Sequence, residues 1–129
     1  MRPALPTLYD AVGGEPAVTH LVARFYHHMA TLPEARDTLA LHVDLERARD
    51  RFTLFLIGWL GGPDVYVERF GHPRLRARHM PFAIGERERD QWLLCMERAT
   101  ADVISDPAVA AALMRAFVPV ANHMINQHE

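Results

Sequence analysis

Apolar residues recur at helical spacing along nearly the whole chain, and this periodicity limits the possible folds more than any other sequence feature. Between Val18 and Met29, apolar positions fall three or four residues apart, as on one face of a helix. Pro16 suits the first turn of that helix, and Gly13 and Gly14 separate it from a shorter apolar segment. No alternation of apolar and polar residues lasts long enough to predict a sheet. The sequence therefore predicts an all-α fold.

Several helix boundaries can be predicted from capping and breaking residues. Asp44 and Asp106 are suited to cap a first helical turn, and Pro107 fits the first position after its cap. The glycine and proline residues at 61–63 end the helix that begins at Asp44. We expect helices at 7–12, 15–31, 34–39, from 44 to the break at 61, and at 64–70, 73–79, 86–104 and from 106 onward.

The composition fits one folded domain spanning residues 1–129. Half of the residues are apolar and 23% are charged, which provides for a core and argues against disorder. The net charge of −2 argues against a nucleic-acid partner, and the single cysteine, Cys95, excludes an internal disulfide. No apolar run reaches the roughly 18 residues that a membrane span needs, and the N-terminus does not read as a secretion signal. We therefore expect a soluble, cytoplasmic protein that does not insert into a membrane.

The chemically informative residues are concentrated between positions 52 and 92. Leu75 and His79 are four residues apart, so they share one face of a short predicted helix, and the apolar residues 80–82 follow. A neutral imidazole in an apolar wall is a good iron ligand, and one histidine commonly holds haem iron. A lone histidine of this kind is nevertheless more often an ordinary core or surface residue with a hydrogen-bonded ring.

Three arginines precede this histidine at alternate positions. Arg74 and Arg78 are four residues apart and can point the same way, with Arg76 between them. A guanidinium group suits a carboxylate because it can donate two parallel hydrogen bonds. The alternatives are a solvated charged face or a phosphate-binding patch.

Two aromatic residues offer hydrogen-bond donors inside apolar helical segments. Trp92 carries an indole N–H and Tyr26 carries a hydroxyl. Such donors stabilise a ligand that gains negative charge from ferrous iron. Both residues could equally be core aromatics whose polar tips have found backbone partners.

One long stretch carries a resemblance to a known family. From Trp59 to Met96 the sequence reads WLGGPDVYVERFGHPRLRARHMPFAIGERERDQWLLCM, and YDAVGG and RFY stand near its start. Together these segments resemble the truncated haemoglobins of group II, in order and over nearly the whole chain. The resemblance implies a truncated globin fold, in which a two-over-two helical sandwich surrounds one haem b.

The resemblance also implies roles for particular residues. His79 matches the iron ligand of the family, and Tyr26, His42 and Trp92 match positions on the opposite, distal side of the iron. Leu39 or Leu41 could occupy the position given to His42. Arg78 is the first choice for binding a haem propionate, and Ala48 cannot hydrogen-bond a ligand. The expected haem contacts are Arg47, Ala48, Phe52, Phe55, Tyr66, His72, Leu75, Arg78, Phe82 and Trp92.

The function implied by the resemblance is reversible binding of dioxygen, carbon monoxide and nitric oxide. Such binding could serve oxygen storage or transport, or redox chemistry on small oxidants. Nitric-oxide dioxygenation and peroxide reduction are both conceivable, and each would need an external reductase. The alternatives are a gas-sensing module that acts on a separate partner protein and a helical fold that has lost its haem. The protein is expected to be a monomer or a homodimer.

Overall fold

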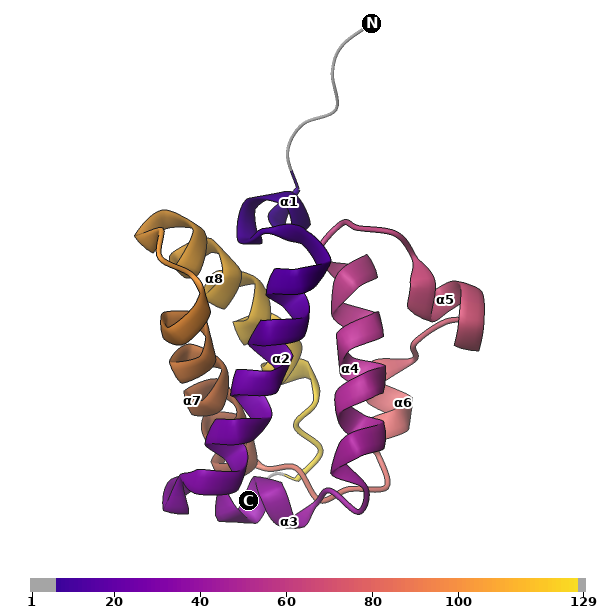
Figure 1. Ribbon diagram of the computed structural model, residues 1–129. Helices are drawn as coiled ribbons and strands as arrows, with labels where there is room; N and C mark the ends of the chain where they lie inside the picture. The colour runs from indigo at the N-terminus through magenta and orange to yellow at the C-terminus, as the bar shows by residue number, and fades with distance from the viewer. Residues whose placement is uncertain (1–6, 128–129) are drawn as a thin grey trace, which may run out of the picture.

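The computed structural model describes residues 7–127, and these residues form helices and loops without a strand (Figure 1). This arrangement confirms the predicted all-α fold; the predicted domain, 1–129, extends past the described residues at both ends. No helix in the described part of the chain is long and apolar enough to cross a membrane. In chain order the elements are α1 (Leu8–Val12), α2 (Gly14–Thr31), the 3-10 turn η1 (Pro33–Ala35), α3 (Arg36–Ala40), α4 (Leu45–Trp59), α5 (Val65–Phe70), α6 (Leu75–His79), α7 (Glu86–Val103) and α8 (Pro107–His123).

Side-chain caps set the starts of two long helices as the sequence predicts. The Asp44 carboxylate accepts a hydrogen bond from the Arg47 amide at the start of α4, and the Asp106 carboxylate accepts one from Ala108 at the start of α8. Pro107 occupies the first turn of α8, where its missing N–H removes no helical hydrogen bond.

Two helical pairs form the body of the molecule. Helix α2 packs against α4, α7 packs against α8, and α2 also lies along α7, so that the pairs cross as two layers (Figure 1). The apolar face predicted for α2 lies entirely inside, because each of its residues is fully buried. The fully buried core contains Val18, Leu21, Val22, Phe25 and Met29 of α2, with Leu56, Cys95, Met96, Ala99 and Leu113 from the other three helices.

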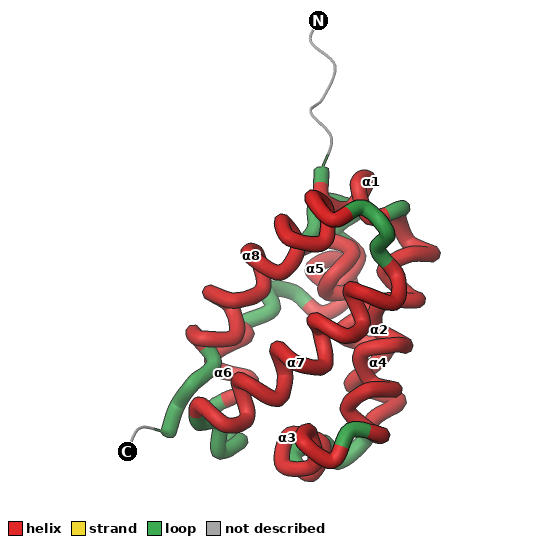
Figure 2. Tube along the Cα trace, turned by 90° about the vertical axis from the view of Figure 1, so that its left-hand side faces the viewer, coloured by secondary structure: helices red, strands yellow, loops and turns green. Residues whose placement is uncertain are grey.

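Two proline-containing segments differ from the prediction. The helical turn expected at 34–39 is divided, because Pro33 opens a 3-10 turn before α3 begins at Arg36. Helix α6 begins at Leu75 rather than at residue 73, because Arg74 adopts a left-handed conformation with φ of 48°. Figure 2 shows the short α6 beside the end of α8, on the side of the molecule from which the C-terminus leaves.

Candidate functional site

His79 ends α6 with its imidazole orientated by its own helix. The ring Nδ1 lies 2.6 Å from the carbonyl oxygen of Leu75, one turn earlier. Because a carbonyl oxygen can only accept, Nδ1 must carry a hydrogen, and in the neutral ring Nε2 then has a free lone pair. This is the protonation pattern of a metal-ligating histidine, whose second nitrogen donates to a carbonyl or carboxylate.

His42 is held in the same manner at the other side of the site. Its Nδ1 lies 2.9 Å from the Thr38 carbonyl oxygen, so its Nε2 is also unprotonated in the neutral ring. Burial lowers the pKa of His42, the hydrogen bond to the Thr38 carbonyl opposes that change, and the nearby His79 ring lowers the pKa further because two protonated imidazoles would repel each other. His42 therefore presents a hydrogen-bond acceptor rather than a donor near neutral pH.

An aromatic cluster next to His42 unites three helices. Tyr26 of α2 lies with its ring centroid 5.7 Å from that of His42 and 6.3 Å from that of Phe52. Trp92 of α7 is 6.1 Å from Phe52, which comes from α4. Phe25 packs edge-on against all three, at 4.9 Å from Tyr26, 5.4 Å from Phe52 and 5.2 Å from Trp92. The structure thus gathers the three predicted distal residues around one point.

The polar tips of this cluster have no protein partner. Within residues 7–127, no hydrogen bond engages the Tyr26 hydroxyl or the Trp92 indole N–H, and no fully buried side-chain nitrogen or oxygen lacks a partner. Both groups must therefore border open space. Burial raises the pKa of Tyr26 well above its ordinary value, so its hydroxyl keeps its proton. The alternative of core aromatics bound to the backbone does not describe these two residues.

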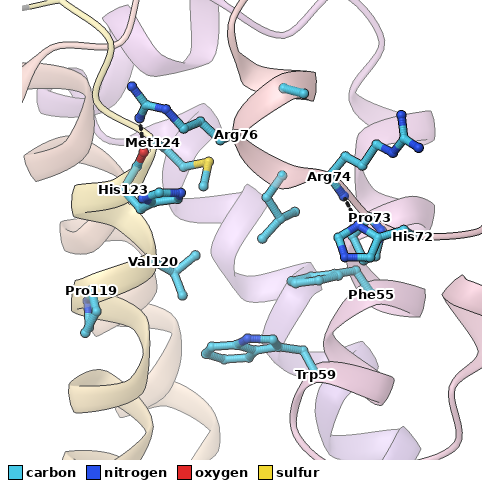
Figure 3. Close-up of a pocket in the computed structure, with 12 residues that line it drawn as sticks. Phe55, Trp59, His72, Pro73, Arg74, Arg76, Pro119, Val120, His123 and Met124 are labelled. Carbon is cyan, nitrogen blue, oxygen red and sulfur yellow. Dashed lines mark hydrogen bonds between the residues drawn. The ribbon is translucent and has the colours of Figure 1, made fainter.

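A cleft of about 680 Å³ lies between α4, α6 and the end of α8. Phe55 and Trp59 form one wall, and Val120 of α8 and Met124, just past the end of α8, lie opposite (Figure 3). Three predicted haem contacts line the cleft: Phe55, His72 and Leu75. The cleft is also lined by residues that were not predicted as haem contacts: Trp59, Arg74, Arg76, Ala77, Pro119, Val120, His123 and Met124. For Trp59, Val120 and Met124 the signal in the sequence is apolar helical spacing, which does not separate core from cavity wall.

The basic residues predicted to bind the haem propionates do not all lie at the cleft. Arg78 is exposed and donates from Nε to the Pro73 carbonyl at 2.8 Å, which leaves its terminal nitrogens available. The His72 ring accepts the Arg74 amide at 3.1 Å. Arg47 does not line the cleft and borders a separate crevice that includes Arg51, Arg69 and Phe70.

The remaining predicted contacts differ in exposure. Tyr66 is buried and packs edge-on against Phe55, with ring centroids 6.1 Å apart. Ala48 is half-buried one turn before Phe52 on α4. Phe82, in the turn after α6, is 38% exposed and provides an apolar surface that the protein itself leaves uncovered.

A buried polar network that the sequence did not reveal fixes the position of His42. The Gln91 side-chain oxygen accepts hydrogen bonds from both the amide and the hydroxyl of Thr38, each at 2.9 Å. The Gln91 amide nitrogen donates to Asp37 at 3.0 Å. Since the Thr38 carbonyl orientates His42, this network links α7 to the distal imidazole across 53 residues of sequence.

The chemistry of these groups fits a haem group. Its macrocycle is flat and apolar, its iron takes an imidazole nitrogen, and its two carboxylates need cations or donors at the protein edge. Of these groups only Phe55 lines the cleft itself; Phe52, Trp92, His79 and Arg78 are not among its lining residues. Phe52 and Trp92 offer aromatic surface, with ring centroids 6.1 Å apart. His79 offers a free Nε2 in its neutral ring, and no hydrogen bond among the described residues engages the terminal guanidinium nitrogens of Arg78.

Comparison with known proteins agrees with this fit. A sequence model of the bacterial-like globins matches residues 7–126. A group 2 truncated haemoglobin of Bacillus subtilis is 37% identical over 121 residues, which cover 94% of this chain and 89% of that protein. A solved group II haemoglobin of Agrobacterium tumefaciens superposes with a TM-score of 0.93 at 44% identity, covering 99% of this chain and 100% of that one. A cold-adapted truncated haemoglobin of Pseudoalteromonas haloplanktis gives 0.92 at 44% identity, with 95% and 100% covered.

Fold and site together therefore define a globin. More narrowly, this chain belongs to the bacterial-like globin family and, within it, to the group 2 truncated haemoglobins. Membership of this family implies a haem cofactor and diatomic gas ligands.

Proposed function

We propose that the protein binds one haem b through Nε2 of His79 and that the haem-loaded protein binds dioxygen and other diatomic gases reversibly. The observation that carries this proposal is the hydrogen bond from His79 Nδ1 to the Leu75 carbonyl, 2.6 Å long, which prepares the opposite nitrogen as a ligand. When bound, haem supplies an iron atom at which a diatomic gas binds.

The protein contributes the walls and anchors for the macrocycle. Phe52, Phe55 and Trp92 supply flat apolar surfaces, and Leu75 and Phe82 add aliphatic and aromatic contact on the His79 side. Arg78 is the main propionate partner because Nη1 and Nη2 are unengaged, whereas its Nε is fixed to Pro73. In addition, His72, Arg47 and Tyr66 are weaker candidates for the same carboxylates, and Ala48 leaves space at the pocket mouth.

The single cysteine supports a haem that is held without a covalent bond. Cys95 is fully buried among core residues, and burial raises the pKa of its thiol to about 11. A haem attached through thioether bonds requires reactive cysteines in a short motif next to the ligating histidine, and the sequence around His79 has none. The pattern favours a haem held without a covalent bond, for which haem b is our proposal.

On the distal side, the proposal assigns donor and acceptor roles separately. The Tyr26 hydroxyl and the Trp92 indole N–H donate hydrogen bonds to a gas that carries negative charge, since neither group is otherwise engaged. His42 accepts rather than donates, because its Nε2 is unprotonated. It can therefore take a hydrogen bond from the Tyr26 hydroxyl and compete with the gas for that proton.

Reversible binding in a polar pocket is compatible with oxygen storage or transport and with redox chemistry on nitric oxide or peroxide that uses an external reductase. The two donors at Tyr26 and Trp92 favour slow release of dioxygen, which is more useful for chemistry than for delivery. A gas-sensing role with a separate partner is the alternative. A cytoplasmic location and a monomeric or homodimeric state remain predictions from the sequence.

Reversibility can be tested with the haem-loaded ferrous protein. The protein is exposed alternately to dioxygen and argon while its visible spectrum is recorded. We expect the spectrum to alternate between two forms over repeated cycles, at one gas molecule per chain. Conversion to a ferric spectrum within the first cycle, or no spectral change with dioxygen or carbon monoxide, would contradict the proposal.

A further inference from the structure

Helix α6, which carries His79, has little stability of its own. It is five residues long, lacks a side-chain cap and buries none of its residues completely. Its preceding residue, Arg74, holds a left-handed backbone conformation that costs free energy for any residue other than glycine. Helices this short are unstable in isolation because nucleation is unfavourable. The position of His79 must therefore be fixed from outside the helix.

Asn126 supplies such a connection just past the end of α8. Its side-chain amide donates to the carbonyl oxygen of His79 at 3.2 Å and to that of Phe82 at 2.8 Å. Its side-chain oxygen accepts the Ile84 amide at 2.9 Å. The backbone amides of Asn126 and Gln127 both donate to the Ile84 carbonyl, at 2.8 and 3.0 Å. Asn126 thus joins the C-terminus of α6 to the turn that follows it.

Arg76 makes a connection in the opposite direction. Its Nη1 donates to the carbonyl of His123, the last residue of α8 (Figure 3). It also donates to the carbonyl of Ile125 at 3.2 Å. These carbonyls lie at or beyond the helix end, where no helical amide satisfies them, so the guanidinium group caps α8. Arg76 of α6 therefore satisfies carbonyl oxygens at the end of α8, and Asn126, just past α8, satisfies carbonyl oxygens at the end of α6 and in the turn after it.

We propose that residues 124–127, here called the C-terminal strap, position His79 for its iron, with Asn126 and Arg76 as the positioning residues. The inference rests on the proposed function, since it concerns how firmly the ligating imidazole is held. Neither residue needs to touch haem to do this. When the strap is released, α6 has no cap and no buried anchor, so the imidazole samples a wider range of orientations and haem is held less tightly.

Asn126→Asp tests this with minimal change in shape. The carboxylate still accepts the Ile84 amide but cannot donate to the carbonyls of His79 and Phe82. Asn122→Asp is the matched control: Asn122 lies four residues earlier and its side-chain oxygen accepts from Arg89 at 3.0 Å, an interaction that a carboxylate preserves. Neither substitution alters the aromatic walls.

Three measurements on the haem-loaded variants follow. Transfer of haem to an excess of a haem-scavenging globin gives the release rate, amide exchange at Phe82 and Gln127 gives the opening of the strap, and resonance Raman spectroscopy gives the iron–histidine stretch. For Asn126→Asp we expect roughly tenfold faster haem release and amide exchange, as the loss of two neutral hydrogen bonds implies, and a shifted stretch. Asn122→Asp should match the wild type in all three.

Other results would overturn the inference. If Asn126→Asp speeds amide exchange but leaves haem release and the iron–histidine stretch unchanged, the strap is structural and does not position His79. If Asn126→Asp fails to fold, Arg76→Met decides through amide exchange and the iron–histidine stretch, since Arg76 also lines the cleft and its loss can alter haem release directly. Wild-type values of both would also reject the proposal. A wild-type protein that takes up no haem would instead refute the proposed function, and that result is distinct because exchange at Phe82 and Gln127 remains measurable.

Discussion

Removing the Tyr26 hydroxyl should change the release of dioxygen without changing the stability of the protein. Tyr26→Phe removes one oxygen and leaves the ring in place against Phe25, His42 and Phe52, whose centroids lie 4.9, 5.7 and 6.3 Å away. No described residue hydrogen-bonds that oxygen, so its loss orphans no group in the protein. The free energy of unfolding of the haem-free protein should therefore change by less than about 0.5 kcal/mol.

The dioxygen dissociation rate should respond much more strongly. A hydrogen bond to an acceptor bearing negative charge contributes about 1.5–3 kcal/mol, and each 1.4 kcal/mol corresponds to about a tenfold change in rate or affinity. Tyr26→Phe should thus speed dioxygen dissociation about tenfold to a hundredfold. Bound carbon monoxide carries little charge, so its dissociation rate should change by less than about threefold.

Stopped-flow measurement of both dissociation rates, together with urea unfolding, tests this reasoning. Tyr9→Phe, which removes a hydroxyl from α1 outside the aromatic cluster, is the control and should leave both rates unchanged. Equal acceleration of dioxygen and carbon monoxide would mean that the pocket had changed shape, and no acceleration would mean that the hydroxyl does not contact the gas. A stability loss above about 1 kcal/mol would show that the hydroxyl has a partner within the protein.

Two further predictions concern the network behind His42 and the pairing of α2 with α7. Gln91→Leu leaves the Thr38 amide without its acceptor, so the free energy of unfolding should fall by about 1–3 kcal/mol in urea titrations; an unchanged midpoint would contradict the network. Hydrogen bonds from His28 at 2.6 Å and Arg24 at 3.0 Å hold the pKa of Asp102 below its usual range. The ionised carboxylate therefore stabilises the fold above about pH 4, and this stabilisation is lost as the pH falls through the pKa of the folded state. Because Asp102 is partly exposed, Asp102→Asn should lower the free energy of unfolding by at most about 1 kcal/mol at pH 7. Urea unfolding at pH 7 and in acid should show that the difference from the wild type vanishes in acid. A difference that persists in acid would refute this.

Local sequence patterns predicted the parts of this molecule that depend on neighbours in the chain. The spacing from Val18 to Met29 gave a buried helix face, and Asp44 and Asp106 marked helix starts, because both effects act within a few residues. The pairing of Leu75 with His79 likewise follows from one helical turn. Of these residues, Leu75 and His79 also stand in the stretch that carries the family resemblance, whereas Asp44 and Asp106 do not.

The features that escaped prediction depend on contacts between distant segments. Asn126 bonds to residues more than 40 positions earlier, and Gln91 to Thr38 across 53 positions, so no local spacing reveals either. The late start of α6 follows from the positive φ of Arg74, a conformation that arginine rarely adopts and that sequence alone does not suggest. Val120 and Met124 have the spacing of core residues, and only the position of the end of α8 across from α4 and α6 places them at a cleft.

The central claim is that His79 ligates a haem iron, and a haem titration followed by visible spectroscopy tests it most directly. The wild type, His79→Ala and, as a control, His20→Ala are each titrated with haem in the ferric and ferrous states; His20 is an exposed histidine of α2 that does not line the cleft. We predict a Soret band that saturates at one haem per chain in the wild type and in His20→Ala, with dioxygen and carbon monoxide spectra that are lost or grossly altered in His79→Ala. A folded helical wild type that binds no haem, or a His79→Ala variant with the wild-type spectra, would contradict the account.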